Sequence, residues 1–256
     1  MIAILTHMSK LVVVIPTYNE KENTKRIIVK LRRTFLKLKK WNPQILIVDG
    51  NSPDGTSIVV KTLSQKYKNV HLLLEPQKRG LGAAYLSGMK HAFGRLKAEI
   101  AVTMDADLSH DPVCLPKILN KIETGSDFVV GSRYIKGGSI PKNWPLHRKF
   151  LSIFGNLATQ LLLESRAIND WTTGYRAFRK EVFQKVVPVM EKDAAFKGYT
   201  FNISFAYHTI EAGFKVSQVP INFIDRTAGD SKLGMEYLFY TPIFLVKTRL
   251  KKFLSV

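Results

Sequence analysis

The first half of the sequence alternates between short apolar runs and longer amphipathic segments, and this alternation restricts the fold more than any other feature. The apolar runs are rich in β-branched residues, as buried strands are, and span residues 10–16, 44–49, 70–74, 99–104 and 127–130. The segments between them repeat apolar residues at helical spacing and span residues 21–40, 56–67, 80–93 and 112–122. Such alternation predicts an α/β chain with a mostly parallel, Rossmann-like sheet flanked by helices.

The second half is less regular. Its patterns predict helices over residues 148–163 and 201–212 and strands over residues 173–179 and 214–223. We expect one domain over residues 1–234, followed by an amphipathic helix over residues 235–256 that carries basic residues near its end. Such a helix suits the headgroup region of an anionic membrane, or it packs on the domain or on a second subunit.

Polar residues follow several of the predicted strands at the point where each strand ends. The stretch PTYNE (residues 16–20) follows the first strand, Asp49 ends the second, and MDADLSH (residues 104–110) follows the fourth. In open parallel sheets ligands bind beyond the carboxyl ends of the strands. We therefore expect these three stretches to form one site at that edge.

Asp105 and Asp107 are the most informative pair at this edge. Two neighbouring carboxylates repel each other unless a cation joins them. Carboxylate oxygens are hard ligands that suit Mg²⁺ or Mn²⁺, and Mg²⁺ is commonly held by one or two carboxylates together with substrate phosphates. The plainer interpretation is that Asp107 caps the following helix and Asp105 is merely solvated. The motif alone does not separate the two.

The charge of the chain suggests an anionic partner. The sequence of 256 residues has 39 Lys and Arg against 20 Asp and Glu, a net charge of +19. This excess fits nucleic acid, anionic lipid or phosphorylated small molecules, or a generally lysine-rich proteome. Cys114 is the one cysteine, so no disulfide framework forms and a reducing compartment is expected. No apolar run reaches the ~20 residues of a spanning helix, and Pro242 interrupts the nearest candidate.

Several motifs occur in an order that resembles a known family. They read VVVIPTYNE, ILIVDGNSPDGT, RGLGAAYLSG, MDADLSH, GSRYIKGG, DWTTGYRAF, GYTFNISF and VPINFIDRTAGDSKL, within residues 10–233. The sequence is similar to glycosyltransferase family 2, and within it to the dolichol-phosphate or polyprenyl-phosphate mannose synthase group.

The resemblance implies a GT-A fold and the transfer of a hexose to dolichyl or polyprenyl phosphate. The transfer would depend on Mg²⁺ or Mn²⁺ and invert the anomeric carbon, and the expected donor is GDP-mannose, which supplies mannose. It also implies a peripheral protein on the cytoplasmic side of a membrane, and leaves open whether a separate membrane protein anchors it. The implied acceptor is already anionic, because the second pKa of a phosphate monoester is about 6, so the reaction needs no strong general base.

The resemblance also implies roles for individual residues. The nucleoside pocket would be lined by Pro16, Tyr18, Glu20 and Asp49. Asp105 would contact the ribose or the metal, with Asp107 and Ser109 as further metal ligands. The acceptor phosphate would meet Arg133, Arg148 and Ser152. The catalytic residues would be Asp107, Arg133, Arg226 and Lys232. Arg226 and Lys232 lie in a loop that would close over the donor diphosphate.

Two departures from the family pattern and two rival functions stay open. Gly50 stands where relatives have a second Asp, which leaves the preferred nucleoside uncertain, and Ser109 stands where some members have Gln. The first rival is glucose transfer from UDP-glucose. The second is nucleic-acid binding, which the few aromatic residues of the basic segment 21–40 disfavour. Asp170 and Arg176 either pair with each other or contact substrate.

Overall fold

Seven strands form one sheet at the centre of the described chain. The computed structural model describes residues 8–192, 200–225 and 236–254. The strand order is β3-β2-β1-β4-β6-β5-β7. The strands are β1 Ser9–Thr17, β2 Trp41–Asp49, β3 Val70–Leu74, β4 Ile100–Thr103, β5 Phe128–Ser132, β6 Arg176–Arg179 and β7 Val216–Pro220. All neighbours pair in parallel except β6, which runs antiparallel to β4 and β5. The mostly parallel sheet expected from the sequence is confirmed.

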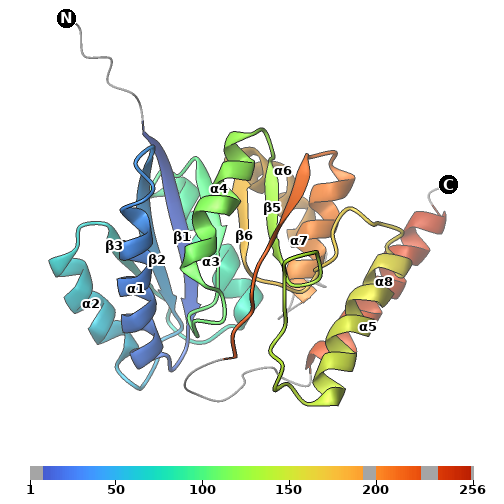
Figure 1. Cartoon of the computed structure of the whole chain (residues 1–256), viewed down its shortest axis with the longest axis horizontal. Helices are drawn as coiled ribbons and strands as arrows, with labels where there is room; N and C mark the ends of the chain where they lie inside the picture. Colours follow the sequence, from blue (N-terminus) through green and yellow to red (C-terminus); the bar gives the residue numbers. More distant parts are fainter. Residues whose placement is uncertain (1–7, 193–199, 226–235, 255–256) are drawn as a thin grey trace, which may run out of the picture.

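Helices cover both faces of this sheet (Figure 1). They are α1 Lys21–Phe35, α2 Thr56–Lys66, α3 Leu81–Gly94, α4 Leu115–Glu123, α5 Leu146–Leu162, α6 Lys180–Lys192, α7 Thr200–Glu211 and α8 Glu236–Leu254. Successive side chains of β1 point to opposite faces: Leu11 and Val13 join a core with α1 and α4, whereas Val12 and Val14 join a core with α3 and α7. Burial on both faces explains why β1 is a continuous apolar run.

A glycine sets how closely α3 approaches the sheet. A Cβ on Gly88 would lie 2.4 Å from Val14 Cγ1 and 2.8 Å from Val48 Cγ2. Because these atoms belong to buried strand residues that cannot move aside, only glycine fits at this point. The close packing fixes α3, and with it Tyr85, beside the end of β4.

Some predicted elements differ from those observed. Helix α6 was not predicted, the helix expected over residues 21–40 ends at Phe35, and the strand expected over residues 173–179 begins only at Arg176. In the C-terminal segment, α8 packs against α5 and α7 and buries Phe244 and Leu245. Within the described residues, every helix is too short or too polar to cross a bilayer.

Candidate active site

Asp105 is held in place by Tyr85 of α3 and by His110 of its own loop. The Tyr85 hydroxyl donates a hydrogen bond to Asp105 Oδ1 over 2.8 Å. The backbone N–H of Asp105 donates to His110 Nδ1 over 3.0 Å, so this nitrogen carries no proton and the neutral ring is protonated on Nε2. The 3.7 Å approach of Nδ1 to Asp105 Oδ2 is therefore not an ion pair. His110 is buried and orders this loop.

Gly174 provides the space for this arrangement. A Cβ at Gly174 would lie 2.8 Å from the Tyr85 hydroxyl, 3.2 Å from Asp105 Oδ1 and 3.6 Å from His110 Cε1. The residue precedes Tyr175, whose ring packs on that of His110 at 5.3 Å. A side chain at position 174 would displace the carboxylate, so Gly174 positions Asp105 without touching a ligand itself.

Asp107 is oriented by Ser109. The backbone N–H and the hydroxyl of Ser109 both donate to Asp107 Oδ1, over 3.1 and 2.6 Å. Leu108 between them has a φ of +67°, a costly conformation for a residue with a side chain. The Ser109 hydroxyl donates its proton to Asp107 and keeps its oxygen lone pairs, so the expectation that Ser109 is a further metal ligand stays a prediction. The alternative that Asp107 caps a helix is also wrong, because Asp111 accepts the capping hydrogen bond from Val113.

The two carboxylates fit a divalent cation that shares its remaining ligands with a substrate. Asp105 and Asp107 lie together beyond the end of β4, and among the described residues no group of three His, Cys, Asp or Glu side chains could hold a metal by itself. Mg²⁺ and Mn²⁺ suit such a site, because phosphate oxygens and water complete the shell.

The nucleoside end of the site differs from expectation at Asp49. Its side chain is fully buried and accepts hydrogen bonds from Thr17 Oγ1 at 2.9 Å, Ser52 Oγ at 2.6 Å and the Ser52 N–H at 2.9 Å. These contacts tie the loop after β2 to β1. Asp49 is therefore buried in the contact between these two segments, and its role at the nucleoside stays a prediction. Tyr18 lies at the same edge with the Lys78 ammonium 4.6 Å from its ring centroid, and Glu20 accepts from Asn23 over 2.7 Å.

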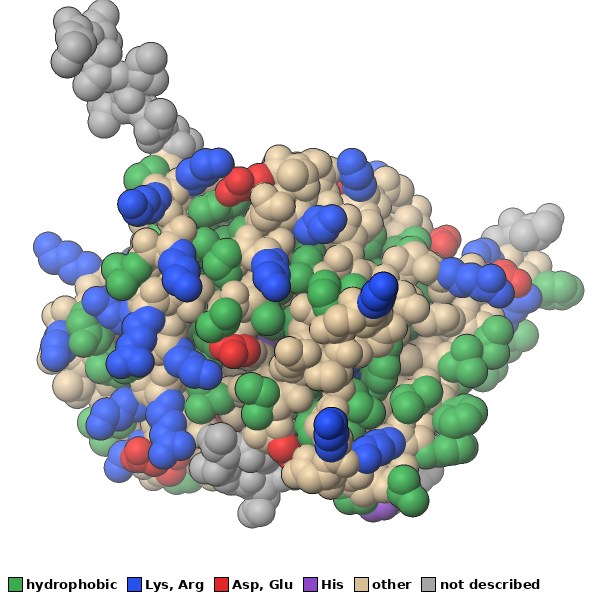
Figure 2. Space-filling model, in the orientation of Figure 1, with side chains coloured by type: hydrophobic (Ala, Val, Ile, Leu, Met, Phe, Trp, Pro, Cys, Tyr) green, Lys and Arg blue, Asp and Glu red, His purple; other side chains and the backbone are tan. Residues whose placement is uncertain are grey.

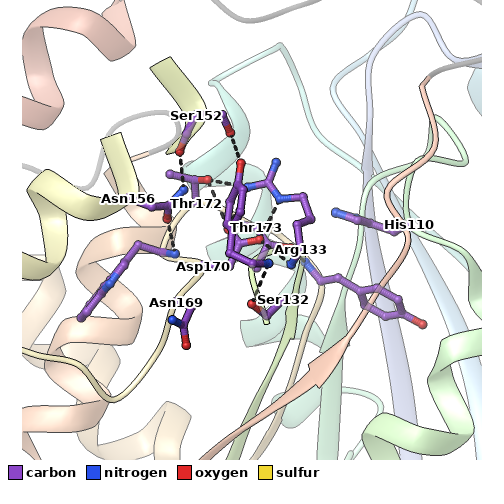
Figure 3. Close-up of polar contacts among 12 residues, drawn as sticks. His110, Ser132, Arg133, Ser152, Asn156, Asn169, Asp170, Thr172 and Thr173 are labelled. Atoms are coloured by element: carbon purple, nitrogen blue, oxygen red, sulfur yellow. Dashed lines mark hydrogen bonds and ion pairs between the residues drawn. The ribbon is translucent and has the colours of Figure 1, made fainter. Parts of the chain in front are cut away.

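Arg133 and Asp170 form a buried ion pair next to this edge (Figure 3). Asp170 Oδ2 accepts from Arg133 Nε at 2.7 Å and from its backbone N–H at 3.0 Å, while Oδ1 accepts from Nη2 at 2.7 Å. Nη2 also donates to the Thr172 hydroxyl over 2.7 Å. Burial opposes ionisation of Asp170, but the charge and hydrogen bonds of Arg133 outweigh it and hold the pKa of this carboxyl below its usual value.

This pair also gives the partner of Asp170, which the sequence left open. Arg133 is itself buried, with 8% of its surface exposed. Asp170 binds Arg133 directly, whereas Arg176 donates to the backbone carbonyls of Asn202 and Trp171. Burial lowers the pKa of Arg176 to about 10, so it stays charged at neutral pH and ties β6 to α7.

Helix α5 carries the other predicted acceptor residues, Arg148 and Ser152. Ser152 Oγ lies 2.5 Å from the hydroxyl of Tyr134, the residue after Arg133, and Figure 3 shows Ser152 beside the Arg133 side chain. Arg148 stacks 3.9 Å above the Trp144 ring and lies 3.5 Å from Asp225. The structure therefore gathers Arg133 and Ser152 and places Arg148 one helical turn from Ser152. Arg226 and Lys232 lie outside the described residues.

Sequence reasoning missed several supporting residues. Tyr85, Lys78, Thr172 and Gly174 all contact a predicted site residue or its surroundings. A signal was present for three of them, because Thr172 and Gly174 lie in DWTTGYRAF and Tyr85 lies in RGLGAAYLSG. The sequence did not show which residues these side chains contact in the folded structure.

Comparison with known proteins identifies the family. The family profile described as Glycosyl transferase family 2 matches residues 12–187, more than half of the chain. The chain belongs to this family. It is a glycosyltransferase with a GT-A-like sheet.

Two relatives match most of the chain. A polyprenol monophosphomannose synthase of Mycolicibacterium smegmatis is 40% identical over 223 residues, which cover 87% of this chain and 80% of the relative. An undecaprenyl-phosphate mannosyltransferase of Micrococcus luteus is 36% identical over 226 residues, 88% of each chain.

Solved structures share the fold. Glucosyl-3-phosphoglycerate synthase of Mycobacterium tuberculosis matches with a TM-score of 0.61 at 17% identity, over 95% of this chain and 79% of that one. A mannosyltransferase of Pyrobaculum calidifontis, solved in complex with GDP-Man and Mn²⁺, matches with a TM-score of 0.57 at 17% identity, over 96% of this chain and 64% of that one. At this identity the likeness shows the fold alone.

Proposed function

We propose that this glycosyltransferase moves mannose from GDP-mannose to a polyprenyl or dolichyl phosphate, with inversion at the anomeric carbon. The names of the two relatives support the sugar and the lipid acceptor. One observation supports the proposal within the structure: on its inner side α5 brings Ser152 to Tyr134, the residue after Arg133, and on its outer side it exposes a row of large apolar side chains. A lipid phosphate needs a polar surface for its phosphate and an apolar surface for its lipid chain.

The donor would bind at the end of β4. Asp105 and Asp107 would hold Mg²⁺ or Mn²⁺ together with the donor diphosphate, and the bound ion would offset the negative charge that develops on the β-phosphate. Tyr85 and Ser109 keep the two carboxylates in place for this. Arg226 and Lys232 remain proposed contacts of the diphosphate.

The acceptor would bind at Arg133, Arg148 and Ser152. A phosphate monoester is anionic near neutral pH, so it attacks without a base, and the protein has to aim it. The planar guanidinium of Arg133 is held at two nitrogens by Asp170, which fixes its direction. Burial raises the pKa of the Tyr134 phenol, so Tyr134 stays neutral, and its hydroxyl forms a hydrogen bond with the hydroxyl of Ser152.

The outer surface of α5 and α8 fits a bilayer. Figure 2 shows hydrophobic side chains gathered along the edge of the molecule where these helices lie side by side. The exposed residues are Leu146, Phe150, Leu151, Ile153, Phe154, Leu157 and Leu161 on α5, and Ile243, Val246, Leu250, Phe253 and Leu254 on α8. Basic residues border this surface: Lys149, Lys247, Lys251 and Lys252. We therefore propose peripheral binding to an anionic membrane on its cytoplasmic side, with or without a separate anchor protein.

A donor and acceptor panel tests the function. Purified protein with Mn²⁺ or Mg²⁺ is given GDP-mannose, UDP-glucose or UDP-GlcNAc, with a short polyprenyl phosphate or the unphosphorylated polyprenol. We expect lipid-linked product from GDP-mannose and the phosphate only. Product from UDP-glucose alone would favour the rival donor, and no product from any donor would overturn the proposal.

A further inference from the structure

Two aromatic rings hold the two arginines of the proposed acceptor site. The guanidinium carbon of Arg148 lies 3.9 Å from the centroid of the Trp144 ring, and that of Arg133 lies 5.3 Å from the centroid of the Phe223 ring. The two rings contact each other edge to face, with centroids 5.6 Å apart. Both cations lie within the range at which an aromatic face attracts a cation. The aromatic pair therefore brings an arginine that follows β5 and an arginine of α5 to one site.

Each arginine has a carboxylate partner, and the two ion pairs differ in strength. Asp170 is fully buried and accepts hydrogen bonds of 2.7 Å from Nε and Nη2 of Arg133. Asp225 approaches Arg148 through one pair of atoms, Oδ1 and Nη1, which are 3.5 Å apart. A charged hydrogen bond is shorter, at about 2.7–2.9 Å, and the side chains of this second pair are 36% and 35% exposed. The carboxylate at Arg148 can therefore be exchanged for another anion at the lower cost.

The charges of these four side chains cancel. Arg133 and Arg148 contribute two positive charges, and the two aspartates contribute two negative charges. A phosphate monoester brings a further charge of about −1.5 to −2 near neutral pH. Phosphate beside both carboxylates would place like charges together, whereas the departure of one carboxylate leaves a site with a net positive charge. Asp170 is enclosed by the protein, so Asp225 is the one that can turn its carboxylate into water.

The neighbours of Asp225 fix its backbone at this place. The N–H of Ile224 donates to the Ser109 carbonyl over 3.3 Å. The Phe223 ring meets the His110 ring edge to face, with centroids 5.6 Å apart. Both contacts tie the segment after β7 to the loop after β4. The carboxylate of Asp225 can therefore leave and return by rotation of its side chain while the backbone stays in position.

We propose that the Asp225 carboxylate occupies the acceptor-phosphate position at Arg148 and gives way when the phosphate binds. The identity of this phosphate as that of a lipid acceptor rests on the proposed function. Phosphate satisfies the guanidinium better than this carboxylate does, because it can accept two parallel hydrogen bonds from it. Asp225 does not touch the acceptor. It is a positioning residue that keeps Arg148 over the Trp144 ring and lowers the affinity of the site for anions.

Binding of a soluble acceptor tests this proposal. The probe is geranyl phosphate, with geraniol as its uncharged counterpart, and its dissociation constant is measured by calorimetry with Mn²⁺ and GDP, so that no transfer occurs. We expect Asp225→Asn to bind geranyl phosphate about threefold more tightly than the wild type, because the competing charge is gone. Asp225→Glu, which keeps the charge, should show no gain. The control Asp127→Asn removes the same charge from a similar pair, 3.6 Å from Arg179 and 32% exposed, and should match the wild type.

Three outcomes would overturn the assignment. A loss of affinity in Asp225→Asn would mean that the carboxylate supports the site, and an unchanged affinity would mean that it lies apart from the phosphate. An equal gain in Asp127→Asn would mean that net charge alone is responsible. If the wild type prefers geranyl phosphate to geraniol but shows any of these results, only this inference fails. If the wild type does not prefer geranyl phosphate, the proposed acceptor fails and the inference with it.

The arginine gives a second, independent measurement. Arg148→Gln removes the guanidinium and should weaken geranyl phosphate at least about tenfold. In this background the gain from Asp225→Asn should fall towards one, because the carboxylate and the phosphate no longer compete for a guanidinium. A threefold gain that persists in the double variant would show that Asp225 acts on the phosphate from elsewhere and would contradict the proposal.

Discussion

Replacing Asp170 by Asn tests how the acceptor site is built. The substitution keeps the shape of the side chain but removes its charge and turns one oxygen into an N–H donor. Asp170 is fully buried and accepts three hydrogen bonds from Arg133, so the change leaves a buried guanidinium without its counter-charge and sets two donors against each other. Breaking a buried pair in this way costs roughly 3–5 kcal/mol.

The magnitude converts to a measurable shift in melting temperature. At 2–4 °C per kcal/mol for a chain of this size, Asp170→Asn should melt roughly 6–20 °C below the wild type. The control is Asp127→Asn, because Asp127 lies 3.6 Å from Arg179 and its side chain is 32% exposed. An exposed pair is worth at most about 1 kcal/mol, so the control should shift little.

The loss of stability in Asp170→Asn should depend on pH. The folded-state pKa of Asp170 is depressed, so its ionised form stabilises the protein above the unfolded pKa of about 3.9, and this contribution is lost as pH falls through the lower folded pKa. The gap in melting temperature between wild type and Asp170→Asn should therefore be full at pH 7 and narrow below about pH 4. A gap that is absent at pH 7, or one that does not change with acid, would refute the argument.

Three further substitutions address the other parts of the site. Gly174→Ala should weaken Mn²⁺-dependent GDP binding, because the new Cβ would lie 2.8 Å from the Tyr85 hydroxyl and 3.2 Å from an Asp105 oxygen; unchanged binding in calorimetry would contradict this. Asp107→Ala should lower the transfer rate at least about a hundredfold, whereas Asp111→Ala, which removes the cap of the 3₁₀ turn Pro112–Cys114 and an ion pair with Lys30, should cost about 1 kcal/mol of stability and keep activity. Phe154→Ser should weaken sedimentation with anionic vesicles about tenfold, and Ile58→Ser should not, although Ile58 on α2 is more exposed than Phe154; equal effects would rule out α5 as the membrane surface.

The sequence predicted those parts of the fold that depend on local periodicity. The residues of β1 are apolar at successive positions because both faces of the strand are buried, and that pattern is visible without a structure. Helix α6 was missed because Pro188 lies inside it and argues against a helix. Its buried residues Val182, Val186 and Met190 nevertheless repeat at helical spacing, so packing outweighed the missing hydrogen bond.

The sequence predicted that Asp49 and Asp105 follow parallel strands at one edge of the sheet, but it did not predict the direction of each side chain. Asp49 ends β2 as expected, yet Ser52 and Thr17 bind its carboxylate and turn it inward. An aspartate at the end of a strand turns inward when residues of a neighbouring strand or loop donate hydrogen bonds to it. The local sequence pattern does not show whether such donors are present. The same holds for Arg133 and Asp170, which are 37 residues apart in the chain.

The position of α5 explains why the acceptor residues belong to a helix and not to a loop. Ser152 and Asn156 are one turn apart on the inner side, where the Asn156 amide donates to the Ser152 carbonyl at 2.7 Å and accepts from the Trp171 N–H at 2.7 Å. Phe150 and Phe154 are one turn apart on the outer side, with ring centroids at 4.0 Å. A helix holds both pairs at a fixed separation. If the outer pair enters the bilayer, the inner residues stay at a constant height above it, which is the height at which a lipid phosphate would arrive.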